Sequence, residues 1–144
     1  MMRKIGVTAV AYLVPTFALG FVWHLVAFKS YYDALAMYRR DVIIPFGLLS
    51  MGLQAVLFAW LFDAAFAHVS SPGRRSLWFV AFGAVLSWSF TTIAVAAKNV
   101  MSSVPDYLLI ESAFTAVQWA LVGPLMAFAH SKAAGEGAAS PRGV

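Results

Sequence analysis

Seven polar or ionisable side chains interrupt the apolar stretches of this sequence, and they form its candidate site. The set comprises His24, Gln54, Ser87, Thr91, Lys98, Glu111 and Gln118. Polar side chains are costly inside a membrane, so those found there mark either a functional site or a contact between helices. Helical spacing places Gly83, Ser87 and Thr91 on one face, and Glu111 and Gln118 on another.

If these faces turn inward, the side chains border a polar pocket that is open to the outer surface. His24, Lys98 and Glu111 would lie near its mouth, with the glutamines and hydroxyl groups deeper. Such a pocket suits a small ligand or a transferred proton. Helix packing explains the same pattern, because small residues four apart permit close approach and buried glutamines join helices by hydrogen bonds. We prefer packing, and the ligand pocket is the alternative.

Two carboxylates lie near the ends of apolar stretches. Glu111 and Lys98 flank one short loop, so we expect an ion pair between them, with Glu111 as a proton carrier in the alternative. Asp63 lies about one turn inside the opposite boundary, within reach of Arg74 or Arg75. We interpret Asp63 as a structural residue.

The three histidines do not form a recognisable metal motif. His24 belongs to one end of the expected structure, whereas His68 and His130 belong to the other. The sequence has no cysteine, nucleophile elbow, phosphate-binding loop or paired carboxylate motif. We therefore expect no catalytic residue, metal or cofactor and favour a protein that is not an enzyme. A haem-linked redox subunit that uses His68 and His130 is the weakest alternative.

The composition is that of a membrane protein. Hydrophobic residues make up 62% of the chain and charged residues 11%, against about 25% charged residues in soluble domains. The mean hydropathy is +0.80. The net charge of +4 comes from Lys and Arg residues scattered at loop ends, which indicates membrane flanks rather than a nucleic-acid surface. The lipid bilayer is thus the expected partner, and nucleic acid is not.

Four apolar stretches are long enough to cross about 30 Å of hydrocarbon as helices. They span residues 5–28, 43–67, 77–97 and 107–129. Backbone groups in lipid must bond internally, so the sequence predicts an all-α, four-helix transmembrane bundle that forms one domain over residues 1–130. The connection 29–41 has the tyrosines and basic residues of an interfacial helix. The glycine-rich tail 131–144 is expected to be disordered.

The second and fourth stretches share a pattern that suggests two tandem helical hairpins. Pro45 and Pro105 open them, Gln54 and Gln118 lie near their middles, and Ala-Phe-Ala-His closes both. The spacing drifts by two residues between the two ends of this alignment, and Ala, Phe and Leu are common throughout the chain. Duplication and coincidence therefore both remain open.

An even number of spans puts both termini on one side of the membrane. That side carries Arg3, Lys4, Arg74, Arg75, Lys132 and Arg142, and the other carries Lys29, Arg39, Arg40 and Lys98. Cytoplasmic flanks are enriched in Lys and Arg, so we expect both termini in the cytoplasm of a bacterial cell, with the chain in its inner (plasma) membrane.

Residues 20–61 carry a series of aromatic and proline motifs. They include Trp23-His24-Leu25, Tyr31-Tyr32-Asp33, Met37-Tyr38-Arg39 and Ile43-Ile44-Pro45-Phe46-Gly47-Leu48. This segment resembles small bacterial four-helix membrane proteins classified as a domain of unknown function (the 1761 type). The resemblance implies the four-helix membrane architecture and no particular activity.

Two functions follow from these observations. The first is a non-enzymatic accessory or structural membrane component, which would self-associate or join a larger membrane complex. The alternative is a binder or carrier of a small molecule, which would use the outward-facing polar pocket.

Overall fold

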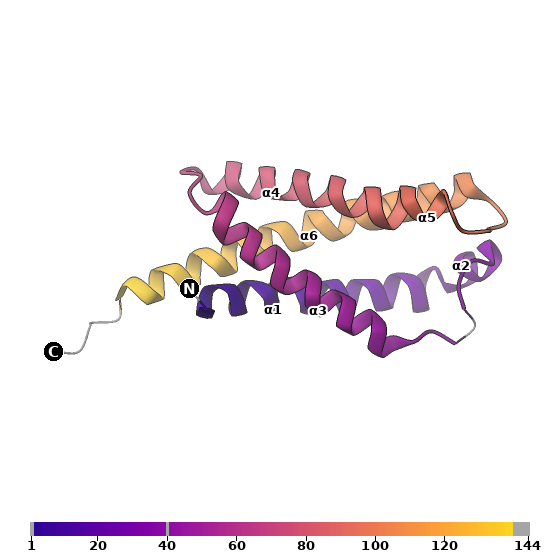
Figure 1. The fold of residues 1–144 in the computed structure, drawn as a ribbon, viewed down its shortest axis with the longest axis horizontal. Helices are drawn as coiled ribbons and strands as arrows, with labels where there is room; N and C mark the ends of the chain where they lie inside the picture. The colour runs from indigo at the N-terminus through magenta and orange to yellow at the C-terminus, as the bar shows by residue number, and fades with distance from the viewer. Residues whose placement is uncertain (1, 40, 140–144) are drawn as a thin grey trace.

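Four long helices and a short interfacial one make up the part of the chain that the structure describes (Figure 1). The structure is a computed structural model that describes residues 2–39 and 41–139. Its elements are α1 (Met2–Val22), η1 (Trp23–Ala27), α2 (Lys29–Leu35), α3 (Ile44–Leu61), η2 (Phe62–Phe66), α4 (Pro72–Ser87), η3 (Trp88–Ile93), α5 (Ala94–Ala96) and α6 (Val104–Ala139). The three η elements are π-helical turns that continue α1, α3 and α4.

Four helices are long and apolar enough to cross a membrane, which confirms the predicted architecture. They span Met2–Ala27, Ile44–Phe66, Pro72–Ala96 and Val104–Glu136. The third begins at Pro72 rather than at residue 77, because Ser71 accepts a hydrogen bond from the Arg74 amide and Pro72 occupies the first helical position. The start of α1 and the end of α6 lie at the same end of the molecule (Figure 1).

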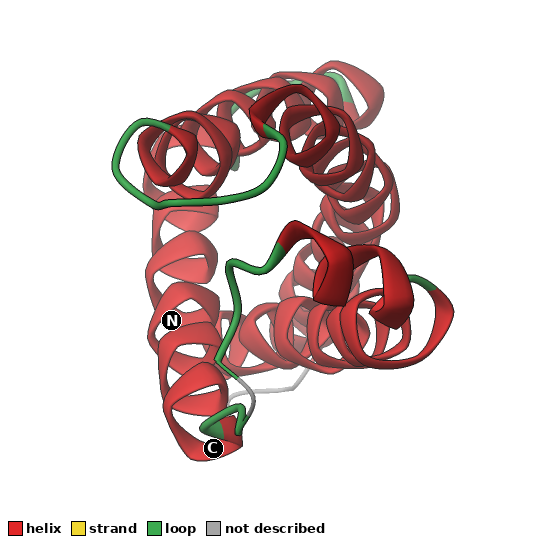
Figure 2. Cartoon of the chain, turned by 90° about the vertical axis from the view of Figure 1, so that its right-hand side faces the viewer, coloured by secondary structure: helices red, strands yellow, loops and turns green. Residues whose placement is uncertain are grey.

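Helix α6 is the centre of the packing. Helices α1 and α4 both pack along α6. Helix α3 instead packs mainly on α1, which it crosses obliquely (Figure 1). Figure 2 shows the long helices arranged around a common axis. Helix α3 leans away from α4 over its first turns, so it meets α4 only near its end, where Phe58 packs on Phe79 and the continuation η2 also packs on α4.

The core lies on the side where α4 meets α6 most closely. A Cβ atom added to Gly83 would lie 2.0 Å from the Trp119 ring, and the indole nitrogen of Trp119 donates a hydrogen bond of 3.0 Å to Ser87 Oγ. Phe58 and Phe79 meet Trp119 edge to face. The stripe that begins with Gly83 and Ser87 is therefore a close-packing surface, as the packing interpretation predicted.

The connection after α1 forms a cap over one end of the bundle. Helix α2 buries Tyr32 and Leu35 against Tyr107, and it ends at Ala36, whose φ of 57° is left-handed. The predicted interfacial helix is thus present over Lys29–Leu35. Arg40, which was assigned to this connection, lies outside the described residues.

The prediction of a disordered tail from residue 131 is wrong over residues 131–139. Helix α6 continues to Ala139, because Ala133 is buried and Glu136 forms an ion pair with Arg3 on α1. The folded unit therefore extends past residue 130. Residues 140–144 lie outside the described part of the chain.

Candidate functional site

A cavity of about 780 Å³ lies between the four long helices. It brings together six of the seven predicted residues, namely His24, Gln54, Ser87, Thr91, Glu111 and Gln118. Lys98 is not among the lining residues and is exposed beyond α5. The predicted grouping of polar side chains therefore holds on every helix, with Lys98 as the one residue that lies elsewhere.

The cavity reaches the outer surface of the bundle between α3 and η3. Leu48 on α3 and Phe90 on η3 both line it, yet they are 46% and 69% exposed. Such apolar side chains face hydrocarbon when a helix crosses a bilayer. The opening is therefore at the side of the bundle, where acyl chains would lie.

Glu111 forms the polar end of the cavity and is almost fully buried. Its Oε1 atom lies 3.1 Å from His24 Nε2 and accepts a hydrogen bond of 3.2 Å from the Tyr38 hydroxyl. His24 Nδ1 lies 3.0 Å from the Gly20 carbonyl, and a carbonyl only accepts, so Nδ1 carries a proton. One further proton is then shared between His24 Nε2 and Glu111, as imidazolium with carboxylate or imidazole with carboxylic acid.

The π-helical turn η1 positions His24 for this contact. A π turn widens the helix by one residue and is frequent at functional sites. In η1 it turns His24 toward α6, while the next residues lead into α2, which returns Tyr32 and Tyr38 over the same carboxylate. Three separate segments therefore converge on Glu111.

Aromatic rings surround the pair of His24 and Glu111. The His24 ring lies 4.5 Å from Phe114, 4.8 Å from Tyr32 and 6.2 Å from Tyr38, measured between centroids. Burial raises the pKa of the Tyr32 and Tyr38 hydroxyls, and the Glu111 charge raises both further. Both phenols therefore stay protonated, and Tyr38 is the one that donates a hydrogen bond to the carboxylate.

A second polar group lies deeper in the cavity wall. The Tyr12 hydroxyl donates to Gln54 Oε1 at 2.9 Å, and the Gln54 amide nitrogen donates to Ser50 Oγ at 3.2 Å. Thr16 Oγ1 is buried in the same wall without a hydrogen-bond partner among the described residues. Gln118, which is 7% exposed, completes this level. Tyr12, Gln54 and Ser50 therefore bond mainly to one another, and Thr16 Oγ1 is almost inaccessible.

The predicted partners of both carboxylates were wrong. Glu111 pairs with His24 rather than with Lys98, since α2 and Tyr38 close over it while Lys98 points into the exposed loop. Asp63 pairs with His130 at 2.7 Å and with Lys4 at 3.2 Å. Arg75 instead donates two hydrogen bonds to the Val69 carbonyl.

The three histidines occupy different environments. His68 is exposed in the turn after η2, whereas His130 is buried and directs Nε2 to Asp63. In residues 2–39 and 41–139, no group of three or more His, Cys, Asp or Glu side chains is placed to hold a metal ion. The haem alternative needs His130 to give up its bond to Asp63, so the structure offers no support for it.

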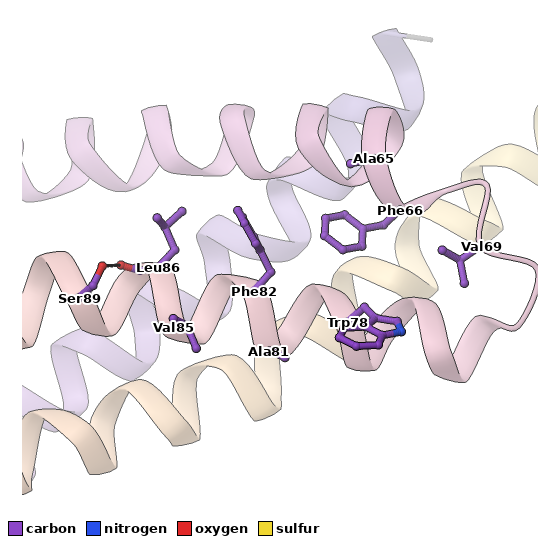
Figure 3. A pocket seen from close by; sticks show the side chains of 9 residues that line it. All are labelled: Ala65, Phe66, Val69, Trp78, Ala81, Phe82, Val85, Leu86 and Ser89. Atoms are coloured by element: carbon purple, nitrogen blue, oxygen red, sulfur yellow. Dashed lines mark hydrogen bonds between the residues drawn. The ribbon is translucent and has the colours of Figure 1, made fainter.

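A smaller hollow of about 570 Å³ lies on the outer face between η2 and α4 (Figure 3). Phe66, Trp78 and Phe82 form much of its wall, and Ser89 is the one hydroxyl among its lining residues. It lacks the hydrogen-bonding groups of the larger cavity, so we treat it as a lipid-facing groove.

Most residues that line the large cavity were not predicted as part of a site, and Tyr38 and Tyr12 are two of them. Tyr38 comes from the interfacial segment, and only its place among several tyrosines close to Trp23-His24 hints at a return over the first helix. Tyr12 reaches Gln54 from α1 and has no distinguishing signal in the sequence. The hydrogen-bond partners of both tyrosine hydroxyls can be assigned only when the packing of the helices is known.

No protein-family model, curated protein or solved structure matches the chain. The resemblance to the 1761-type domain of unknown function therefore stays a prediction.

Proposed function

We propose that this chain is a multi-pass protein of the bacterial inner membrane that binds a small amphiphilic molecule between its helices. The large cavity is the observation that supports this function best. Its polar end, at Glu111 and His24, joins apolar walls that reach the side of the bundle. An amphiphile dissolved in the bilayer would match both parts, since its tail fits the walls and its head group meets the polar end.

Close packing accounts for only part of the polar pattern. Gly83 and Ser87 contact Trp119 directly, so packing explains them. Thr16, Gln54 and Gln118 instead line the cavity. The cavity wall is mostly apolar with a polar end, and it opens toward acyl chains, so a bound amphiphile can fill it and meet both kinds of group. We therefore favour the binding function over the accessory one, which was the first choice from the sequence.

Charge at the two ends supports the expected orientation. The start of α1 with Arg3 and Lys4, the start of α4 with Arg74 and Arg75, and the last turns of α6 with Lys132 lie at one end of the bundle (Figure 1). Helix α2 with Lys29, the residues after it with Arg39, and the loop after α5 with Lys98 belong to the other end. The positive-inside rule then places the termini in the cytoplasm and the Glu111 end of the cavity toward the outer surface. Self-association and membership of a larger membrane complex stay predictions.

Two glycines on α3 provide a matched test of this function. Gly47 lines the cavity, Gly52 does not, and in both cases no neighbour lies within 4 Å of the position that a Cβ atom would occupy. We expect Gly47→Trp to fill the cavity and abolish saturable binding of the neutral amphiphile Nile red to protein in lipid nanodiscs. Gly52→Trp should bind as the unaltered protein does. Equal loss in both variants, or no saturable binding beyond that of empty nanodiscs, would contradict the proposal.

A further inference from the structure

We propose that the molecule bound in this cavity carries an organic cation as its head group, with Glu111 as the counter-charge. This inference rests on the proposed binding function and narrows it to one chemical class. It follows from three features of the cavity: the sign of its charge, the rings around that charge and the proton that Glu111 shares with His24.

The cavity wall carries a single carboxylate. Among the lining residues that the structure describes, Glu111 is the only acidic side chain, and there is no Lys or Arg. A buried charge in a low-dielectric site needs an opposite charge close by. An anionic head group would place a second negative charge beside Glu111, whereas a cationic one can take the place of the proton that Glu111 shares with His24.

Aromatic faces line the same end of the cavity. Tyr38, Tyr107 and Phe114 border it together with Glu111, and Tyr107 donates its hydroxyl proton to the Thr91 carbonyl at 2.8 Å. Aromatic rings attract cations through the negative potential of their faces, and this attraction strengthens when water is excluded. A carboxylate enclosed by rings selects an organic cation over a small hydrated one, because the rings contact its apolar groups.

The proton shared by His24 and Glu111 is the charge that the bound cation replaces. The titratable groups that face Glu111 are His24 from η1, Tyr32 from α2, Tyr38 from the following loop and Tyr107 from α6. On the cavity wall, α3 contributes Gln54, α4 contributes Ser87 and η3 contributes Thr91, and none of these side chains titrates in water.

The three phenols are neutral, so the pair of His24 and Glu111 holds the one exchangeable proton. When a cation binds the carboxylate, this proton leaves, His24 becomes a neutral imidazole and the charge of the site is conserved.

Two probes of almost equal shape and opposite charge test the charge selectivity. Tetraphenylphosphonium is a cation and tetraphenylborate an anion. We expect the protein in nanodiscs to bind the cation saturably and to show no saturable binding of the anion above empty nanodiscs. Glu111→Gln should weaken cation binding by about 30-fold or more, since the charge partner is lost. Glu136→Gln, the same substitution at an exposed carboxylate outside the cavity, should have no effect.

Arg40 needs its own variant because it lies outside the described residues. Arg40→Gln is expected to leave cation binding unchanged or to strengthen it. If that substitution abolished binding of the cation, the proposed source of selectivity would be wrong.

Proton release is counted by isothermal titration of the cation in two buffers with different ionisation enthalpies. We expect about one proton released per cation bound. His24→Gln keeps a donor near Glu111 but has no ionisable ring, so it should retain binding with a proton count near zero. A count of zero in the unaltered protein, or an unchanged count in His24→Gln, would overturn the exchange.

Failure of the cation inference is distinguishable from failure of the binding function. Anion or Nile red binding that is as tight as cation binding and is lost in Gly47→Trp overturns the cation selectivity and keeps the function. Cation binding that survives Glu111→Gln also overturns the inference. If none of the three probes shows binding that Gly47→Trp removes, both proposals fall. Thermal unfolding of each variant checks that the fold is intact.

Discussion

Two pairs of histidine and carboxylate join the first half of the chain to α6, and they differ in what surrounds them. His24 meets Glu111 at 3.1 Å, and His130 meets Asp63 at 2.7 Å. In both pairs one partner comes from a π-helical turn, η1 or η2, and the other from α6. The partners on α6 are 19 residues apart (130 − 111), or about 28 Å along the helix.

The two pairs differ in whether a permanent cation lies near the carboxylate and in whether a cavity lies beside it. Asp63 has a permanent cation, Lys4, at 3.2 Å, and it is absent from the walls of both cavities. Glu111 has neutral phenols and an open cavity. The pair of Asp63 and His130, which we call the closed pair, therefore joins helices at one end of the bundle. The pair of Glu111 and His24, the open pair, holds an exchangeable charge at the other end. Trp119 lies between them on α6 and belongs to the packed core that separates the levels of the two pairs.

The strongest expected effect comes from breaking the closed pair. Asp63→Asn leaves His130 buried without its charged partner and should lower the free energy of unfolding by about 2–3 kcal/mol. Unfolding in mixed micelles measures it. Glu111→Gln, which faces a cavity, should cost less than half as much. A larger stability loss at Glu111 than at Asp63 would reverse the roles assigned to the two pairs.

The packed layer between the pairs is the next place to test. A Cβ at Gly83 would overlap the Trp119 ring, so Gly83→Ala should destabilise the protein by about 1–3 kcal/mol. Gly6→Ala is the control, because nothing lies within 4 Å of its Cβ position. Thermal unfolding compares the two variants. If the two variants were equally stable, α4 and α6 would not be packed closely enough at Gly83 to separate the two histidine–carboxylate pairs.

A smaller effect is expected when Asp63 loses its permanent cation. Lys4→Met removes the lysine beside Asp63 and His130. This pair then resembles the pair of Glu111 and His24 in charge, but it has no cavity beside it. Lys4 is partly exposed, so we expect a loss of only about 0.5–1 kcal/mol in unfolding free energy. The variant should not bind tetraphenylphosphonium at Asp63. Binding of a second cation in Lys4→Met would show that charge alone, without the cavity, makes the site.

The smallest effect is spectroscopic. The pKa of Tyr32 and Tyr38 is raised by burial and by Glu111, so these phenols ionise above the ordinary tyrosine value of 10.0. The folded protein keeps protons that the unfolded chain releases, so stability should fall as pH rises above about 10. Phenolate absorbance measures the titration. Glu111→Gln should shift it to lower pH, and Asp63→Asn should not.

The sequence predicted the membrane helices and six polar side chains of the cavity wall, for one physical reason. A polar side chain in an apolar stretch is costly, so its position is informative even without a partner. Helical spacing then indicates which side chains share a face, and this was sufficient for Ser87, Thr91, Glu111 and Gln118.

Partners were harder to predict than faces, because they depend on how each helix is rotated and on where the connections return. Lys98 is close to Glu111 in sequence, yet the loop carries it outward while Tyr38 comes from a distant segment. The hairpin alignment likewise pairs His68 with His130, but one is exposed and the other buried. The tail was misjudged because its glycines obscured Ala133, which is buried, and Glu136, which pairs with Arg3.

Thiol labelling tests most directly whether a cavity lies at the level of Glu111 and not at the level of Asp63, because the chain has no cysteine of its own. Thr16 lines the cavity, whereas Thr8 on the same helix is equally buried and donates to the Lys4 carbonyl beside the closed pair. Thr16→Cys should react with N-ethylmaleimide in nanodiscs, since a hydrated cavity permits thiolate formation, and tetraphenylphosphonium should slow it. Thr8→Cys should stay unreactive. Equal reactivity of the two variants would contradict the account.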